Sequence, residues 1–279
     1  MFFRLITLEE GGDNMIIIAE RINTSRKGIN QAVKEKNAEF IMNEAKAQDE
    51  AGGTFIDVNA GSFMETEVDE LKWIIEQVQK ATSKPLCIDS PDPKVIKQVI
   101  PMVDRTPIMI NSINLEPQRL EGLLPLVAEY NAHVIGLCQT ETTMASSVSQ
   151  KVDMAGQLVE KVESAGIPRQ NLYIDPLVYP ISTDHKTAQA SLEAIEIIMK
   201  TFQGVHTTGG LTNVSYGLPV RKLVNRAFLV CAINRGLDSA IIDPTDKSLY
   251  GALRAATLVS GRDDFCMTYI SDFRSGKLE

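Results

Sequence analysis

The segment GGLTNVSYG, residues 209–217, has the composition of a binding loop, although it contains no acid, base, thiol or metal ligand. Its two leading glycines would allow the backbone to approach a ligand or another side chain closely. Asn213 follows, between the hydroxyl residues Thr212 and Ser215. A side-chain amide both donates and accepts hydrogen bonds. Asn213 would therefore suit a reaction in which a ligand atom gains or loses a proton.

Further carboxylates and carboxamides follow short β-rich runs along the whole chain. In order they are Glu20 and Asn23, Asp57 and Asn59, Asp89 and Ser90, Asn111 and Asn114, Gln139, Asp175, Asn213, and Asp243. Each one taken singly is typical of a residue that caps a helix or begins a turn. If the runs are parallel strands of one sheet, their carboxyl ends meet on one side, and these side chains form one polar rim.

The β-rich runs alternate with segments of helical periodicity, such as NAEFIMNEAKAQDEAG and EVDELKWIIEQVQKAT. Gly52, Asn131, Gly166 and Gly236 stand where a helix would end in a left-handed cap. Eight strand–helix pairs without a linker predict a single (β/α)8 TIM barrel, with its active site at the carboxyl ends of the strands. A doubly wound open sheet is the alternative, but no GxGxxG follows the first run. The runs are MIIIAERI, TFIDVNAG, PLCIDS, PIMINSI, HVIGLCQT, NLYIDPL, GVHTTGGL and SAIID.

Composition excludes several classes of partner. The net charge of −8 and the lack of a basic stripe argue against nucleic acid and anionic membranes. No run approaches the ~18 apolar residues that span a membrane. Cys87, Cys138 and Cys231 lie in apolar runs and no CxxC pair occurs, so we expect reduced, buried thiols in a cytoplasmic protein. No His, Cys and Asp cluster has metal-ligand spacing, and we expect no metal in this chain.

The regular pattern begins at Met15. Residues 9–13 read EEGGD, which a purine-rich bacterial ribosome-binding site would encode if it were translated in frame. We therefore expect Met15 to be the true start, residues 1–14 to be a dispensable extension, and residues 15–279 to form one barrel domain.

A rim of carboxylates and amides favours a ligand that carries many N–H donors and little negative charge. A reduced pterin has this character, because aspartates can accept hydrogen bonds from its amino group and ring N3–H, while Asn and Gln pair with mixed edges. Such charge-assisted bonds contribute roughly 1.5–3 kcal/mol each. Three or four of them would anchor a small ligand.

Several short motifs in register carry a family resemblance. From Met15 to about Phe265 the chain resembles the corrinoid-dependent methyltetrahydrofolate methyltransferases of the pterin-binding TIM-barrel family. It is most similar to the stand-alone methylcorrinoid:tetrahydrofolate methyltransferases linked to demethylation. The resemblance implies methyl transfer between N5 of tetrahydrofolate and the cobalt of a methylated corrinoid, either protein-bound or methylcobalamin. The motifs are ERIN at 20–23, DVNAG at 57–61, CIDS at 87–90, MINS at 109–112, LYIDP at 172–176 and GLTNVS at 210–215.

The resemblance also implies residue roles. Asn213 would be the catalytic residue beside N5, and Asp89, Asn111 and Asp175 would hold the pterin ring. Arg221 falls where the family has an arginine near the aminobenzoate group of folate. We further expect a homodimer, and a separate corrinoid protein that carries the cobalt. The remaining expected pterin or folate contacts are Asp57, Asn59, Glu20, Asn23, Ser90, Gln139, Gly210 and Thr212.

Alternatives stay open at this point. The methyl group could pass from methyltetrahydrofolate to a corrinoid iron–sulfur protein of acetyl-CoA synthesis. We prefer the opposite direction, to 5-methyltetrahydrofolate, in demethylation of a quaternary amine such as glycine betaine or of a methoxylated aromatic. Dihydropteroate synthase shares the barrel and the pterin rim, but it would need basic residues at the ends of the last two strands, which read GGLTNVS and IIDPTD. A non-catalytic folate-binding or corrinoid-docking protein is a further alternative.

Overall fold

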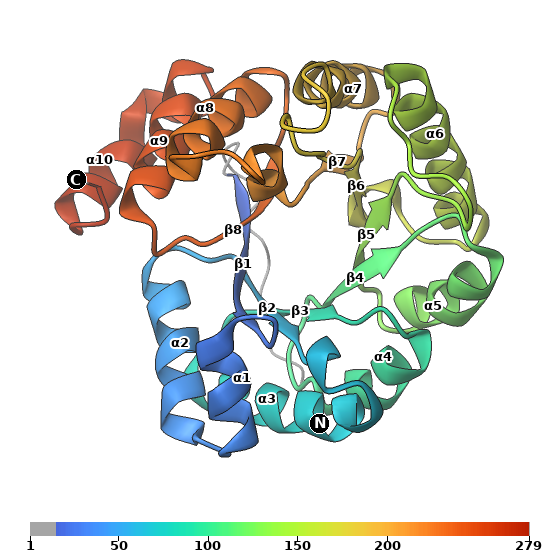
Figure 1. The fold of residues 1–279 in the computed structure, drawn as a ribbon, viewed down its shortest axis with the longest axis vertical. Helices are drawn as coiled ribbons and strands as arrows, with labels where there is room; N and C mark the ends of the chain where they lie inside the picture. The colour runs from blue at the N-terminus through green and yellow to red at the C-terminus, as the bar shows by residue number, and fades with distance from the viewer. Residues whose placement is uncertain (1–14, 279) are drawn as a thin grey trace.

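The computed structural model describes residues 15–278, and these form a ring of parallel strands enclosed by helices (Figure 1). The expected extension at residues 1–14 lies outside the described residues. The strands are β1 (Ile16–Asn23), β2 (Phe55–Asn59), β3 (Leu86–Asp89), β4 (Met109–Ile113), β5 (His133–Leu137), β6 (Leu172–Asp175), β7 (His206–Thr207) and β8 (Ser239–Ile242). Each of the eight β-rich runs overlaps one of them, so the prediction of a (β/α)8 barrel is confirmed.

Helices cover the outside of the ring and follow the strands in turn. The α-helices are α1 (Lys27–Lys34), α2 (Ala38–Glu50), α3 (Glu67–Ala81), α4 (Pro93–Val99), α5 (Pro117–Glu129), α6 (Val148–Ser164), α7 (Thr187–Thr201), α8 (Arg221–Asn234), α9 (Lys247–Val259) and α10 (Met267–Arg274). Short 3-10 helices include η1 (Gly61–Thr66) and η4 (Leu211–Ser215). The predicted left-handed caps are confirmed, since Gly52, Asn131, Gly166 and Gly236 all have positive φ.

The strands are hydrogen-bonded in the order β7-β6-β5-β4-β3-β2-β1-β8. The ring closes between β7 and β8 through an isolated bridge of Gly210 with Ile241, in which the Ile241 N–H donates to the Gly209 carbonyl at 3.1 Å. Side chains reinforce this seam. Asp238 accepts a hydrogen bond from the Thr207 N–H at 2.9 Å and meets His206 Nδ1 at 2.7 Å.

The interior of the barrel fixes the direction of the rim residues. A separate apolar cluster contains Ile18, Phe55, Cys87, Met109, Ile135 and Tyr173. Successive side chains of a strand point to opposite faces, so a residue two positions further along points the same way. Asp57, Asp89, Asn111 and Asp175 each stand two positions beyond a member of this cluster. The interior pattern of the strands therefore points these four side chains inward at the carboxyl ends.

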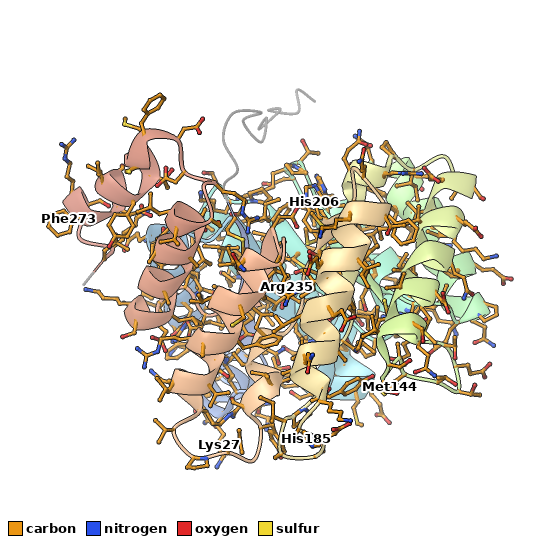
Figure 2. All side chains as sticks on the ribbon, turned by 90° about the horizontal axis from the view of Figure 1, so that it is seen from above. Lys27, Met144, His185, His206, Arg235 and Phe273 are labelled. Carbon is orange, nitrogen blue, oxygen red and sulfur yellow. The ribbon has the colours of Figure 1, made fainter. Side chains whose placement is uncertain are left out.

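The loops at these carboxyl ends lie along one edge of the molecule, where Figure 2 labels Lys27, Met144 and His185, while Phe273 lies toward the opposite edge. Among residues 15–278, no helix is both long and apolar enough to cross a membrane. The expectation of buried thiols holds for Cys87 and Cys138 but is wrong for Cys231, which is exposed on α8. That helix packs through Phe228, Leu229, Ala232 and Ile233, which leaves Cys231 on its outer face.

Candidate functional site

Three neighbouring strands present a continuous row of polar side chains. Asn59 of β2 pairs in register with Asp89 of β3, and Asp89 pairs with Asn111 of β4. The Asn59 amide donates to Asp89 Oδ2 at 2.9 Å and accepts a hydrogen bond from the Gly61 N–H at 3.0 Å. Asn59 thus orients Asp89 from one side. Burial raises the pKa of Asp89 to about 6, although the hydrogen bond from Asn59 and the charge of Arg119 act in the opposite direction.

Asp57 lies one level deeper in the barrel, paired in register with Cys87. Its side chain is almost fully buried, with 2% of its surface exposed. The Asn111 amide donates to Asp57 Oδ1 at 3.4 Å. Burial raises the pKa of Asp57 well above its ordinary value, and the charge of Asp89 adds to the effect. A ligand with N–H donors placed above this pair would favour the ionised carboxylates.

Asp175 stands across the barrel from this row, at the end of β6. It is 7% exposed. Its Oδ1 accepts a hydrogen bond from the Leu177 N–H at 2.7 Å, and burial raises its pKa to about 6 despite this bond and a backbone bond from Gly210. A Cβ added at Gly209 would lie 3.3 Å from Asp175 Oδ1. The first glycine of GGLTNVSYG therefore lets the β7 loop approach this carboxylate.

Asn213 lies on η4, directly after the two glycines. A Cβ at Gly210 would lie 3.3 Å from Asn213 Nδ2, so the second glycine makes room for the amide. The Asn213 side chain is exposed and makes no hydrogen bond within residues 15–278. Arg221 braces this turn, donating to the Thr212 carbonyl at 2.9 Å and to Ser215 Oγ at 3.1 Å. The turn is fixed, while the amide at its centre is free to bind a ligand.

Glu20 adds a fourth carboxylate to the rim. It lies in β1 where the register with β2 shifts between Ala19 and Ile22. Burial raises the pKa of Glu20 to about 7, and the opposing charge of Arg26, at 3.9 Å, moderates the shift. Glu20, Asp57, Asp89 and Asp175 thus all have raised pKa values, each mainly because of burial.

Other members of the expected rim bind within the protein. Ser90 is fully buried and donates to Glu67 Oε1 at 2.6 Å. Asn114 donates to Glu116 at 2.9 Å, and Asp243 accepts from Arg21 Nη1 at 2.9 Å. These three side chains are committed to neighbouring protein groups.

Asn23 and Gln139 stand at the outer part of the rim. Asn23 Oδ1 accepts a hydrogen bond from the Ser25 N–H at 2.9 Å, which shapes the β1 loop. Gln139 is half-buried, forms an isolated antiparallel bridge with Met144, and accepts a hydrogen bond from the Leu115 N–H through its carbonyl. The Gln139 side chain makes no hydrogen bond within the part of the chain that the structure describes, so its amide can still reach a ligand.

Two cations behind the rim, the half-buried Arg119 and the fully buried Lys151, were not anticipated from the sequence. Arg119 of α5 donates to the Ser112 carbonyl at 2.7 Å, to the Ser90 carbonyl at 3.0 Å, and also to Pro91. Lys151 of α6 donates to three backbone carbonyls, one in the loop between β5 and α6 and two in the loop after β6. A signal for Lys151 did exist, because it occupies the apolar stripe of its helix. Arg119 lies in the first turn of α5, where neither its residue type nor its spacing indicated that it would bind the rim.

The chemistry of the site follows from this donor and acceptor set. Four carboxylates and several amides converge, and within residues 15–278 no group of three or more His, Cys, Asp and Glu side chains is arranged to hold a metal ion. The arrangement can accept a row of N–H donors from a flat heterocycle and offer the Asn213 amide to one ring atom.

Fold and site together define a pterin-binding barrel, and the profile of the pterin binding enzyme family matches residues 19–243. The chain belongs to this family, so the family resemblance is confirmed. It is 37% identical over 266 residues to a methylcorrinoid:tetrahydrofolate methyltransferase of Eubacterium limosum, which covers 95% of this chain and 98% of that protein.

Two other matches place the chain more broadly. A methionine synthase of Mycobacterium tuberculosis is 27% identical over 242 residues, covering 82% of this chain and 20% of that protein. The dihydropteroate synthase of Xanthomonas albilineans in complex with 7,8-dihydropteroate superposes with a TM-score of 0.66 and 18% identity, covering 88% of this chain and 92% of that chain. The similarity to the dihydropteroate synthase concerns the fold alone.

Proposed function

We propose that this chain transfers a methyl group between the cobalt of a methylated corrinoid and N5 of tetrahydrofolate, forming 5-methyltetrahydrofolate. The observation that carries the proposal is the 37% identity to a methylcorrinoid:tetrahydrofolate methyltransferase over nearly the whole of both chains. The arrangement of the rim supports it, because the same face offers several carboxylates for a pterin and the unpaired amide of Asn213.

The pterin ring binds between the two sides of the barrel mouth. Asp89 and Asn111 on one side and Asp175 on the other accept and donate hydrogen bonds at the ring edge. Asn59 holds Asp89 in place by its hydrogen bond, and Ser90, the next residue after Asp89, is anchored by its own bond to Glu67. Asp57 forms the floor, while Glu20, Asn23 and Gln139 complete the outer contacts. Gly210 and Thr212 shape the turn that carries Asn213.

The transfer is a displacement at carbon. The N5 lone pair attacks the methyl carbon, the carbon–cobalt bond breaks with its electron pair left on the cobalt of the corrinoid substrate, and the N5 proton passes to solvent water. The Asn213 amide stabilises N5 because it can accept from the N–H before transfer and donate to the lone pair in the reverse direction. A fixed charge at this position would favour one protonation state too strongly.

The corrinoid is a substrate carried by a separate protein. We place the reaction in a demethylation pathway, with glycine betaine or a methoxylated aromatic as the class of methyl source. Methyl transfer to a corrinoid iron–sulfur protein would use the same residues in reverse. Dihydropteroate synthase activity is less well supported, because the ends of β7 and β8 supply the neutral segment 209–215 and the acid Asp243.

We also propose that the protein is a cytoplasmic homodimer. An apolar groove of about 280 Å³ lies between α8 and α9, lined mainly by Val230, Ala252, Ala255 and Val259. Val259 is 87% exposed in the single chain. A second copy would cover this surface.

Light scattering coupled to size exclusion tests the dimer. It should give a mass near twice 30.7 kDa for the wild type and near 30.7 kDa for Val259→Asp. A monomeric wild type would contradict the dimer.

An anaerobic assay tests the reaction. Methylcob(III)alamin and tetrahydrofolate are mixed with the protein, cob(I)alamin is followed by absorbance, and 5-methyltetrahydrofolate is measured by mass spectrometry. We expect both products together, with the rate reduced about 10²–10³-fold in Asn213→Ala and the folate affinity nearly unchanged. Binding without transfer, also in the presence of corrinoid proteins, would indicate a folate-binding protein. An unchanged rate in Asn213→Ala would exclude the proposed role of the amide.

A further inference from the structure

Lys151 is a fully buried lysine within the amphipathic helix α6. The inward-facing residues of this helix are Lys151, Met154, Ala155, Leu158, Val159 and Val162. A lysine on an apolar stripe is costly unless its charge is compensated. The Lys151 side chain has 0% exposure, so it does not reach solvent or a substrate directly.

The ammonium group binds the backbone of two loops at the mouth of the barrel. Lys151 Nζ donates to the Ala145 carbonyl at 3.1 Å, to the Pro176 carbonyl at 2.5 Å and to the Leu177 carbonyl at 2.8 Å. All three protons of the ammonium are therefore used. Tyr179 covers the group, with its ring centroid 4.9 Å from Nζ.

The loop that Lys151 holds is the one that orients Asp175. Leu177 has a φ of 64°, in the left-handed region that a leucine rarely adopts. Its carbonyl is bound by Lys151, while its N–H donates to Asp175 Oδ1 at 2.7 Å. Releasing the carbonyl would allow Leu177 to relax and its N–H to turn away from Asp175. The direction of this carboxylate thus depends on a cation that does not touch it.

We propose that Lys151 is a positioning residue for the pterin: it holds the β6–α7 loop so that the Asp175 carboxylate faces the bound ring. The inference rests on the proposed function, in which Asp175 anchors the pterin. Lys151 also contributes charge, because it lies near Asp175 and opposes the effect of burial on the pKa of that carboxyl.

Affinity for 5-methyltetrahydrofolate, measured by calorimetry, tests the proposal. Lys151→Met keeps the side-chain length and removes the donors, and we expect Kd to rise roughly 10–100-fold, the size of the loss when a residue that orients a metal ligand from behind is replaced. Lys161→Met is the matched control, since Lys161 is exposed on the same helix. Wild-type affinity in Lys151→Met would overturn the proposal.

The pH dependence of binding tests the same idea without a truncation. Burial lowers the pKa of Lys151 to about 8, and the Asp175 carboxylate opposes the shift. The other titratable groups around the ammonium, Cys138 and Tyr179, are neutral near this pH, because burial raises the pKa of each. Wild-type Kd should therefore rise above about pH 8, as the ammonium loses its proton. Lys151→Arg stays charged and should lack this rise. The same alkaline rise in both proteins, or no rise in the wild type, would overturn the proposal.

The experiments separate a failure of the Lys151 proposal from two other outcomes: a variant that does not fold, and a protein that lacks the proposed methyl-transfer reaction. If Lys151→Met does not fold, the comparison of wild type with Lys151→Arg decides. If the wild type binds 5-methyltetrahydrofolate but transfers no methyl group, the proposed reaction fails while the role of Lys151 in binding is still measured. A wild type that does not bind the pterin overturns both.

Discussion

At the scale of single residues, the site is built from carboxylates in an environment that disfavours their charge. Glu20, Asp57, Asp89 and Asp175 all have raised pKa values because they are buried. A pterin that donates N–H groups would restore the interactions that burial removes. We therefore expect these residues to lower the stability of the free protein and to raise its affinity for the ligand.

Asp57→Asn tests this expectation. The pKa of Asp57 is raised in the folded protein, so its contribution to stability is full at low pH and is lost as pH rises through the folded-state pKa. Asparagine is neutral throughout. We expect the variant to be more stable than the wild type by about 1 kcal/mol at pH 8, with a smaller difference at pH 5. Urea unfolding at both pH values measures the effect, with the exposed Asp153→Asn as control. A destabilised variant at pH 8 would show that the charge of Asp57 stabilises the fold.

At the scale of elements, the loops after the strands are fixed by cations from the helices that follow. Arg119 binds the loop after β3 and the end of strand β4, Lys151 binds the loops after β5 and β6, and Arg221 binds the η4 turn. The loop after β8 is held differently, by Arg21 of strand β1, which binds Asp243 and is itself held by Glu44 at 2.6 Å. Rigid loops of this kind support preorganised binding, because little ordering is left for the ligand to impose.

Arg221→Ala distinguishes two roles for this arginine. If Arg221 chiefly braces η4, its loss should reduce kcat about tenfold through Asn213 while KM for tetrahydrofolate changes little. Arg221→Lys should not rescue, since one ammonium cannot reproduce the two bonds to Thr212 and Ser215. Steady-state kinetics with Arg226→Ala as control measures the split. A rise in KM at constant kcat would instead support the expected contact with the aminobenzoate group.

At the scale of the whole molecule, the strands of the barrel are not equally well hydrogen-bonded to one another. Seven strand pairs form ladders, with register shifts in β1–β2 and β4–β5, whereas β7 and β8 meet through an isolated bridge. Asp238 compensates at this seam by binding Thr207 and His206. The weakly paired β7 also leads directly into the loop that carries Asn213. Closure of the barrel and placement of the Asn213 amide thus depend on the same seam.

Asp238→Ala should weaken the seam. The Thr207 N–H would lose its acceptor, and Thr207 is fully buried. An unsatisfied buried donor costs about 1–3 kcal/mol, so we expect the free energy of unfolding to fall by that amount. Urea unfolding followed by circular dichroism measures it, with the exposed Asp153→Ala as control. Equal stability of Asp238→Ala and the wild type would indicate that the seam is held by the backbone bridge alone.

The sequence by itself determined the number, order and type of the strands and the residues at their carboxyl ends. It could do so because strand alternation, helix periodicity and left-handed caps at residues such as Gly52 and Gly236 are local properties. It also predicted that Asp57, Asp89 and Asp175 lie on a polar rim at the carboxyl ends of the strands. Each stands two residues beyond an apolar interior residue, and the strand period therefore turns it toward the interior.

The tertiary structure alone decided which polar residues are free. Ser90, Asn114 and Asp243 resemble Asp89 and Asn213 in sequence, yet they bind Glu67, Glu116 and Arg21. Lys151 binds residues 25 and 26 positions away in the chain. Such partners come from loops and helices brought together by barrel closure, and no local pattern encodes them. The chain thus specifies where its polar groups stand, while packing decides which of them remain available to a ligand.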